Sequence, residues 1–290
     1  MDTSLPNFII IGAMKCATST LHVQLSRQPG FFMSEPKEPN FFSDDDNYAR
    51  GMAYYRSLFE GAGSSQLRGE SSTHYTKLPT YPKALTRMRE HLPALKLIYV
   101  MRHPIDRLVS HYIHEWSMRN INVPIDRAVD LHEELVHYGC YHMQLQPFIQ
   151  VYGRANVLPV FLERLQAESQ SELERVCRFL GYQGAPIWAS DLANQNVSSE
   201  RLRLGKWGRE LFDNPTLTRW RRQIVPQFVR DTIKDRLTMH ERPQLSADKQ
   251  AALRARFDAD LKQLGNDLGA ELDCENFRAS TRERSLDWVV

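Results

Sequence analysis

Three short apolar runs occur in the first two thirds of the chain, and each is followed by a segment with helical spacing. The runs lack the alternation of a half-exposed strand. A continuous apolar run of this length is typical of a strand that is buried on both faces of a parallel sheet. The sequence therefore predicts buried strands over residues 8–11, 95–101 and 157–161. Only the prediction for residues 157–161 is less secure, because Pro159 has no N–H to donate to a neighbouring strand at a central position of the sheet.

The segments that follow these runs place apolar residues on one helical face. Pro29-Gly30 is a natural end for the first helix, and Pro104 suits the first turn of the second. Gly181 suits the C-terminal cap of the third. We therefore expect helices over residues 18–28, 104–118 and 170–180. Strands that alternate with helices favour an α/β fold in which helices flank a central parallel sheet.

The last third of the chain has a different pattern. Residues 194–214 are polar and basic, and we expect a long loop with a short helix there. Residues 246–264 carry four large apolar side chains at helical spacing, which predicts a long amphipathic helix. We expect one domain over residues 1–290, with an α/β core in 7–182 and a basic loop and helical C-terminal portion in 183–290.

The composition narrows the functional classes. The 290 residues include 37 Lys or Arg and 35 Asp or Glu, so the formal net charge is only +2. This balance gives no support to a nucleic-acid-binding protein. Arg outnumbers Lys by 28 to 9, and the planar guanidinium group suits phosphate and sulfate oxyanions. The composition thus favours small anionic ligands over nucleic acid.

The four cysteines are too far apart in the sequence to form a CxxC pair. We therefore expect four reduced thiols and neither a disulfide framework nor a zinc site. The N-terminal apolar run is too short for a signal peptide, and no basic residue precedes it. No stretch approaches the ~20 apolar residues that a membrane span requires. These features predict a cytoplasmic protein without a membrane span.

The loop after the first predicted strand has a composition that suits an anion. Residues 12–20 read Gly-Ala-Met-Lys-Cys-Ala-Thr-Ser-Thr. Unpaired backbone N–H groups and the positive end of the helix dipole meet at such a junction. Lys15 adds a full charge, and the hydroxyls of residues 18–20 add donors. The simpler alternative is an ordinary turn capped by Thr18. The loop is not a Walker A motif, in which Lys directly precedes the hydroxyl residue.

A second anion site is predicted after the strand over residues 95–101. Arg102 follows that strand at the carboxyl edge of the sheet, where open α/β folds bind their ligands. Ser110 lies further along the next predicted helix. A guanidinium group and a hydroxyl together suit a second phosphate group. The alternative is that Arg102 pairs with a surface carboxylate.

Together the two motifs resemble those of the sulfotransferases that use PAPS, 3′-phosphoadenosine 5′-phosphosulfate. The pattern K-x-[GA]-T-[ST] follows the first strand, and R-x-P-x-x-R-x-x-S-x-Y comes later. The resemblance covers residues 7–182 and implies a P-loop-like sulfotransferase fold. It implies that Arg102 and Ser110 hold the 3′-phosphate. It also implies that the first loop holds the 5′-phosphosulfate through Lys15, Cys16, Ala17, Thr18, Ser19 and Thr20.

A third segment, Lys-Glu-Pro-Asn-Phe-Phe at residues 37–42, resembles the KEPHFF stretch of a branch that includes heparan sulfate sulfotransferases and many bacterial enzymes. In that branch the Glu is the proposed general base, which implies Glu38 here. A positioned carboxylate removes the acceptor proton as the new bond forms. The resemblance also assigns Lys37 and Asn40 to the acceptor, although Asn40 stands where the branch has His. The plain alternative is a surface ion pair between Lys37 and Glu38.

Residues 69–75, Gly-Glu-Ser-Ser-Thr-His-Tyr, resemble the acceptor-side GEKTPxY segment of the family. Ser71 stands where many glycan sulfotransferases have Lys, which weakens a heparan-like assignment. The resemblance implies that His74 contacts the acceptor, and the alternative is an ordinary polar loop residue. Residues 196–203 resemble a late N-x-S segment of bacterial members, which implies that Arg201 or Arg203 binds the 3′-phosphate. The alternative for this basic segment is a solvated surface.

The expected reaction is in-line transfer of a sulfuryl group from PAPS to a hydroxyl, or less favourably an amine, of a glycan or small-molecule acceptor. Glu38 takes the acceptor proton, while Lys15 and the loop amides stabilise the leaving 5′-phosphate of PAP. No metal is required. The alternatives are a P-loop-type small-molecule kinase, which needs magnesium ligands, and a non-catalytic nucleotide- or glycan-binding module.

Two properties are not predicted by the sequence, namely the identity of the acceptor and the oligomeric state. The loops of such folds are the most variable parts of the sequence, and they determine which acceptor binds. We expect residues 43–60 and 112–142 to form much of the acceptor pocket. Their aromatic side chains either stack on the acceptor or pack in the core.

Overall fold

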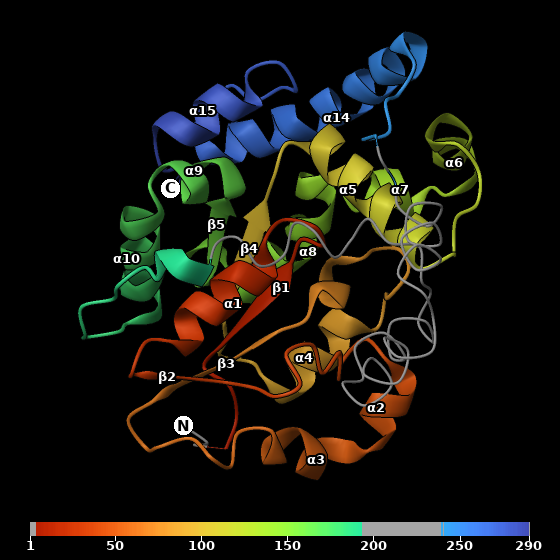
Figure 1. Cartoon of the computed structure of the whole chain (residues 1–290). Coiled ribbons are helices and arrows are strands. Elements are labelled where there is room, and N and C mark those ends of the chain that lie inside the picture. The colour runs from red at the N-terminus through yellow and green to blue at the C-terminus, as the bar shows by residue number, and fades with distance from the viewer. Residues whose placement is uncertain (1–3, 193–238, 240, 290) are drawn as a thin grey trace, which may run out of the picture.

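The computed structural model describes residues 4–192, 239 and 241–289. Over these residues the chain forms a five-stranded sheet in the order β2-β3-β1-β4-β5, in which every neighbouring pair is parallel. Helices lie on both sides of this sheet (Figure 1). The strands are β1 (Phe8–Gly12), β2 (Phe31–Met33), β3 (Leu67–Ser71), β4 (Lys96–Met101) and β5 (Val157–Phe161).

Helices connect the strands and continue beyond the last of them. Those before β4 are α1 (Thr18–Ser26), α2 (Asp45–Ala49), α3 (Gly51–Ser57), the 3-10 helix η1 (Thr73–Thr76) and α4 (Ala84–His91). Between β4 and β5 lie α5 (Pro104–Ser117), α6 (Ile125–Leu131), α7 (Glu134–His137), α8 (Tyr141–Tyr152) and the 3-10 helix η2 (Arg154–Asn156). After β5 come α9 (Leu162–Ala167), α10 (Ser169–Leu180), the 3-10 helix η3 (Ser190–Leu192), α14 (Ala247–Leu268) and α15 (Phe277–Glu283).

All three predicted strands are present, as β1, β4 and β5. Each is buried along almost its whole length, as a continuous apolar run predicts. Pro159 is tolerated because, among the described residues, β5 pairs only with β4 and so forms an edge of the sheet. A proline at an edge removes no ladder hydrogen bond on the open side. The predicted α/β fold with a parallel sheet is therefore confirmed.

The strands β2 and β3 were not expected from the sequence. β2 has only three residues, and β3 reads Leu-Arg-Gly-Glu-Ser, which is not an apolar run. β3 nevertheless lies between β1 and β2, where Glu70 and Ser71 are fully buried. A strand that carries buried polar residues in the middle of a sheet indicates that its carboxyl end contributes to a site.

The predicted helices form with small shifts at their ends. α1 ends two residues earlier than predicted, whereas α10 ends at Gly181, whose φ of 85° is favourable for glycine. Ser246 caps the start of α14, and the helix runs on to Leu268 before Gly269 ends it. The C-terminal helices α14 and α15 pack on α5, α8 and α9 (Figure 1). The predicted loop over residues 194–214 lies outside the described residues.

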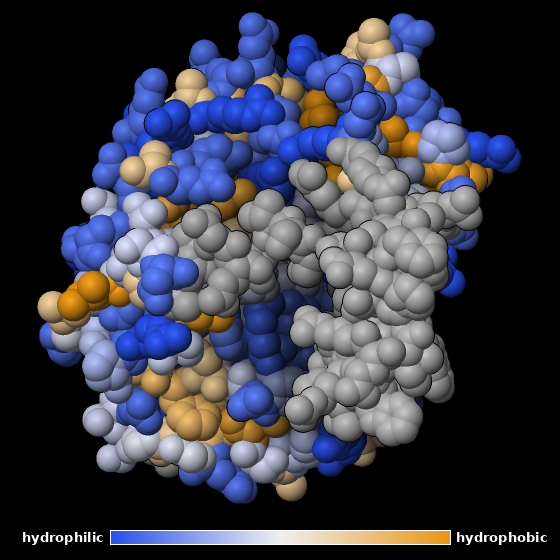
Figure 2. Space-filling model, in the orientation of Figure 1, coloured by the Kyte–Doolittle hydropathy of each residue, from blue (hydrophilic) through white to orange (hydrophobic). Residues whose placement is uncertain are grey.

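Because all strands are parallel, the loops after β1, β3 and β4 meet at one edge of the sheet. The face seen in Figure 2 is hollowed near its middle, and hydrophilic residues form the floor of the hollow. The four cysteines are buried free thiols, as expected. No helix in the described part of the chain is both long and apolar enough to cross a membrane.

Candidate active site

The loop between β1 and α1 turns sharply and leaves the start of the helix open. Lys15 and Ala17 have left-handed backbones, with φ of 69° and 63°. Ala17 is the N-terminal cap residue of α1, and its methyl side chain makes no capping hydrogen bond to the helix. Successive amides in such a turn form a concave anion site at the positive end of the helix dipole. The described loop therefore fits a phosphate group.

The sharp turn depends on Gly12. A Cβ atom on Gly12 would lie 2.1 Å from Thr76 Oγ1 and 2.8 Å from the ring of Tyr99. Thr76 is itself fixed, because its hydroxyl donates to the carbonyl of Ile11 at 2.7 Å. The next amide, that of Ala13, donates to Val100 O at 2.7 Å and ties the loop to β4. Only glycine fits where the loop passes between η1 and β4.

The side chains of the loop divide into a buried and an accessible group. Cys16 is fully buried, and burial raises the pKa of its thiol to about 11, so it is a neutral packing group. Thr18 is also buried on the first turn of α1. The half-buried residues are Met14, Lys15, Ala17, Ser19 and Thr20. The accessible amides, amine and hydroxyls therefore carry the predicted anion site.

The structure brings the second predicted motif against the first. Arg102 directly follows β4, and its Nη1 donates to Lys15 O at 3.5 Å. Ser110 is half-buried on the second turn of α5. Arg107, the second arginine of the same motif, is instead fully buried and donates to the carbonyl of Leu135. Arg107 therefore holds α5 to α7, while Arg102 remains beside the loop.

Glu38 lies in the loop between β2 and α2. Its Oε1 accepts a hydrogen bond from Lys37 Nζ at 2.6 Å, and its Oε2 accepts one from the hydroxyl of Thr73 at 3.3 Å. Burial raises the pKa of this carboxyl, but the opposing effects of Lys37 and Lys77 are stronger and lower the pKa overall. The Lys37–Glu38 ion pair thus exists, and the Glu38 carboxylate remains partly open to solvent.

Asn40 and His74 both follow Glu38 in the sequence, and each is held by contacts with nearby residues. The backbone of Asn40 is left-handed, with φ of 49°, which asparagine adopts more readily than most residues. Its amide donates to Ser72 Oγ at 3.1 Å. The ring of His74 stacks on Tyr81 with centroids 4.6 Å apart. Burial and Lys77 lower the pKa of His74 to about 4, so the ring is neutral at pH 7.

The sequence motifs did not identify Lys77, which follows η1. Its side chain is 8% exposed, and its Nζ lies 5.7 Å from the ring centre of Tyr138. Burial lowers the pKa of this amine to about 8, although Glu38 and Glu115 raise it. A buried amine near Glu38 is a positive group on the acceptor side. No local sequence signal marks it, because its burial depends on residues distant in the sequence, such as Tyr138.

Ser71, which stands where many family members have Lys, has a structural partner. Its Oγ lies 2.9 Å from His22 Nδ1 in a buried hydrogen bond that links β3 to α1. Burial and Lys37 lower the pKa of His22 to about 4. The Ser71 position therefore contributes no charge, and the positive groups beside Glu38 are Lys37 and Lys77.

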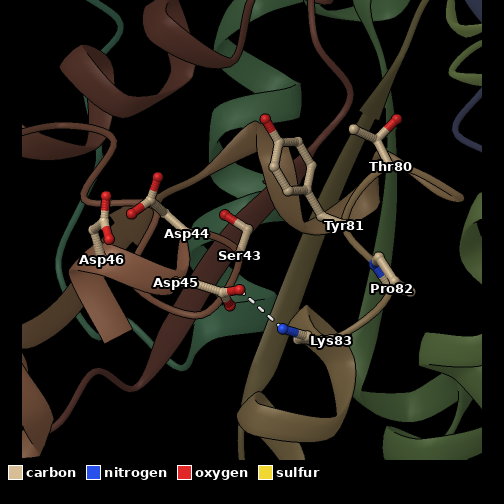
Figure 3. Close-up of a pocket in the computed structure, with 8 residues that line it drawn as sticks. All are labelled: Ser43, Asp44, Asp45, Asp46, Thr80, Tyr81, Pro82 and Lys83. Atoms are coloured by element: carbon tan, nitrogen blue, oxygen red, sulfur yellow. Dashed lines mark hydrogen bonds and ion pairs between the residues drawn. The ribbon is translucent and has the colours of Figure 1, made fainter. Parts of the chain in front are cut away.

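A cavity of about 450 Å³ adjoins the acceptor-side segments. One wall is Ser43–Asp46, which follows the segment of Glu38, and the other is Thr80–Lys83, which follows η1 (Figure 3). Lys83 bridges the walls through Asp45, at 2.9 Å. Tyr81 in the wall of this cavity stacks on His74, the residue after Thr73, which donates to Glu38. Its lining of hydroxyls, carboxylates and one aromatic ring suits a hydroxyl-bearing ligand.

The predicted 3′-phosphate residues Arg201 and Arg203 lie outside the described residues. Of the aromatic residues expected on the acceptor side, Tyr55 and Tyr141 are fully buried. Tyr141 lies beside Arg102 and Cys16, which places it on the side of the two anion motifs. The described residues hold no group of three His, Cys, Asp or Glu side chains that suits a metal ion. The expectation that no metal is required stays a prediction.

A family model described as "Sulfotransferase domain" matches residues 5–203, which is more than half of the chain. Heparan sulfate glucosamine 3-O-sulfotransferase 3B1 of Mus musculus is 30% identical over 187 residues, which cover 61% of this chain and 46% of the relative. Heparan sulfate glucosamine 3-O-sulfotransferase 6 of Homo sapiens is 31% identical over 185 residues, which cover 61% of this chain and 52% of the relative. The chain spans about half the length of these relatives.

Solved structures show the same fold. A sulfotransferase from Alicyclobacillus acidocaldarius superposes with a TM-score of 0.65 at 22% identity, covering 92% of this chain and 97% of that one. The mouse sulfotransferase SULT7A1, in complex with PAP, superposes with a TM-score of 0.53 at 14% identity, covering 95% of this chain and 89% of that one. At these identities the similarity establishes the fold alone.

Proposed function

The chain belongs to the PAPS-dependent sulfotransferase family, and from this premise we propose that it transfers a sulfuryl group from PAPS to a hydroxyl of a glycan or small-molecule acceptor. The family match confirms the resemblance drawn from the sequence. The observation that carries the proposal is that Arg102 contacts Lys15 O in the loop that leads into α1, so that the two predicted anion sites lie side by side.

The donor is assigned to the loop of β1 and to the start of α5. The amides at the start of α1, with Lys15 and the hydroxyls of Ser19 and Thr20, suit the 5′-phosphosulfate. Arg102 and Ser110 suit the 3′-phosphate, because a guanidinium group donates to two phosphate oxygens at once. Arg201 and Arg203 stay candidates for the same phosphate. When bound, PAPS supplies the sulfuryl group and leaves as PAP.

Glu38 is assigned as the general base. Its lowered pKa keeps it ionised at pH 7, so it accepts the acceptor proton as the acceptor oxygen bonds to sulfur. The bond from sulfur to the bridging oxygen breaks on the opposite side, and the electron pair stays on the 5′-phosphate. Lys15 and the loop amides stabilise that negative charge. Lys37 and Thr73 hold the Glu38 carboxylate in place through their hydrogen bonds.

The acceptor is assigned to the region of Glu38, His74 and the adjoining cavity. The hydroxyl and carboxylate lining of that cavity suits an acceptor rich in hydroxyls, which favours O-sulfation over N-sulfation. The mouse and human relatives are named for heparan sulfate. A polyanionic glycan is less favoured here, since Ser71 replaces a lysine and Asp44, Asp45 and Asp46 line the cavity.

Calorimetric titration with PAP in the presence of EDTA tests the donor assignment. We expect metal-free binding by the wild type and a loss of affinity in Arg102→Ala of about 10–100-fold, the range for a charged hydrogen bond. Arg89→Ala is the matched control, because Arg89 is an exposed arginine on α4. If PAP does not bind but ATP binds with magnesium, the proposal is wrong and the kinase alternative takes its place.

A further inference from the structure

Tyr141 is a fully buried side chain that contacts both anion motifs. Its Oη accepts a hydrogen bond from the amide of Arg102 at 3.2 Å, and its O–H donates to the carbonyl of the same residue at 2.5 Å. On its other side, Oη lies 3.8 Å from Cys16 Sγ in the loop of β1. One hydroxyl thus lies between the two motifs that the proposed function assigns to the donor.

The position of Arg102 explains why it needs such a partner. β4 ends at Met101 and α5 begins at Pro104, so Arg102 belongs to neither hydrogen-bonding ladder. A buried backbone amide and carbonyl without partners would each carry a free-energy cost. Tyr141 satisfies both with one group. The pair of bonds also restricts rotation of the Arg102 backbone, and with it the direction of the guanidinium group.

Tyr141 is itself held from a distant part of the chain. It is the first residue of α8, and the next two amides, those of His142 and Met143, donate to the carboxylate of Asp260 at 2.9 and 3.0 Å. Asp260 lies on α14 and thereby caps another helix. The ring of Tyr141 also packs edge-on against Tyr99, with centroids 6.0 Å apart. The connection runs from α14 through α8 to Arg102.

We propose that Tyr141 is a positioning residue that directs Arg102 toward the 3′-phosphate and thereby sets the preference for PAP over nucleotides that lack this phosphate. The proposal rests on the role assigned to Arg102 under the proposed function. It also gives the C-terminal helix α14 a part in donor selection, through Asp260. Asp260 lies beyond the residues that the family model matches.

The test measures the dissociation constants of PAP and of adenosine 5′-monophosphate for the wild type and for Tyr141→Phe. The ratio of the two constants reports the contribution of the 3′-phosphate. We expect PAP to bind about tenfold more weakly to the variant, the typical effect of one buried hydrogen-bonding group. We expect adenosine 5′-monophosphate to bind as before, so the ratio falls. If Tyr141 has a purely structural role, the variant binds both nucleotides more weakly by the same factor and the ratio of the constants stays unchanged. An unchanged ratio, with or without weaker binding, overturns the proposal.

Tyr152→Phe is the matched control, because Tyr152 lies on the same helix and is also buried, and its Oη has no hydrogen-bond partner among the described residues. We expect it to leave both constants unchanged. If Tyr141→Phe does not fold, Asp260→Ala replaces it. That variant removes the cap of α8, and we expect a smaller fall in the same ratio. An unchanged ratio in a folded Asp260→Ala variant then overturns the proposal.

Arg102→Ala separates this proposal from the proposed function. If Arg102→Ala leaves the ratio unchanged, the 3′-phosphate site is wrongly assigned and the proposed function loses its donor site. If Arg102→Ala lowers the ratio and Tyr141→Phe does not, the donor site stands and only the role of Tyr141 is overturned.

Discussion

The donor and acceptor sides of the candidate site are built from different kinds of group. On the donor side, the proposed phosphate ligands are backbone amides, hydroxyls and the charged groups of Lys15 and Arg102, and the groups packed behind them, such as Cys16 and Tyr141, are neutral and buried. On the acceptor side, Glu38, His74 and Lys77 are titratable, and the pKa of each is lowered. The donor side therefore combines charged groups with a fixed backbone, whereas the acceptor side carries groups whose pKa values are shifted by their surroundings.

This difference gives the acceptor side a definite charge pattern at pH 7. The lowered pKa keeps Glu38 negative, and a pKa of about 4 keeps His74 neutral. Lys77, with a pKa of about 8, is still mostly positive. Environments that separate the protonation states of neighbouring groups are typical of sites that move protons. Changes on the acceptor side should alter rate and pH dependence and leave nucleotide affinity intact.

The largest expected effect is that of Glu38→Gln. The amide keeps the size of the side chain but accepts no proton, so we expect the turnover rate to fall by about 10²–10⁴-fold. The affinity for PAP should not change, because Glu38 belongs to the acceptor side. Steady-state rates with PAPS and a hydroxyl acceptor, together with PAP calorimetry, measure the two effects.

Glu35→Gln is the control for this variant, since Glu35 is exposed and lies three residues before Glu38 in the same loop. We expect it to behave as the wild type in both measurements. A loss of PAP affinity in Glu38→Gln that matched its loss of rate would show that the two sides are not separate.

A smaller effect is expected for Lys77→Met. The amine of wild-type Lys77 loses its charge as the pH rises through about 8. If this charge stabilises the acceptor side, kcat/KM of the wild type falls above that pH. We expect Lys77→Met to be about tenfold slower at pH 7, equivalent to ~1.4 kcal/mol, and to lack this alkaline decline. Rates measured from pH 6 to pH 10 provide the test.

Lys77→Arg distinguishes charge from packing, because the guanidinium group stays charged over that whole range. We expect it to retain most of the rate at pH 7 and to keep it at pH 9. An alkaline decline of equal size in the wild type, Lys77→Met and Lys77→Arg would assign the decline to another group.

The same two regions differ in how much of them the sequence predicts. β1, β4 and the loops that follow them were predicted because a continuous apolar run and a helix start are local signals. β3 was not predicted, because its buried Glu70 and Ser71 give it the composition of a loop. Its place in the sheet depends on pairing with β1, which no local pattern encodes.

The candidate site residues follow the same rule. Glu38 was predicted from a contiguous segment, and the structure adds its hydrogen bonds to Lys37 and Thr73. Lys77 was not identified as a site residue, and Tyr141 was expected only within the range of the acceptor pocket and not beside Arg102. Lys77 owes its shifted pKa to burial, and Tyr141 reaches Arg102 from a helix that begins 39 residues later. Packing between distant parts of the chain determines the pKa of Lys77 and the contact of Tyr141 with Arg102. A single sequence without tertiary contacts therefore predicts neither.

The last prediction concerns stability and uses Glu70→Gln, which tests a buried carboxyl on β3 next to the acceptor side. Burial raises the pKa of Glu70 to about 8, and the charge of Glu38 adds to that effect, while the hydroxyls of Tyr75 and Tyr55 oppose it. Below pH ~4.5 the carboxyl is neutral in both the folded and the unfolded chain. As the pH rises toward 8, the unfolded chain releases this proton and the folded chain retains it.

Ionisation of Glu70 must therefore lower the stability of the wild type progressively between pH ~4.5 and pH 8. A glutamine at this position has no proton to release and makes no such contribution. We expect equal melting temperatures for the two proteins near pH 4. Near pH 8 we expect Glu70→Gln to melt ~5 °C higher, as a difference of a few kcal/mol in a chain of this size implies. Calorimetric melting curves at both pH values measure this difference. Parallel pH dependence in the two proteins would mean that Glu70 is already ionised in the fold, and the acceptor side would then hold two negative carboxylates at neutral pH.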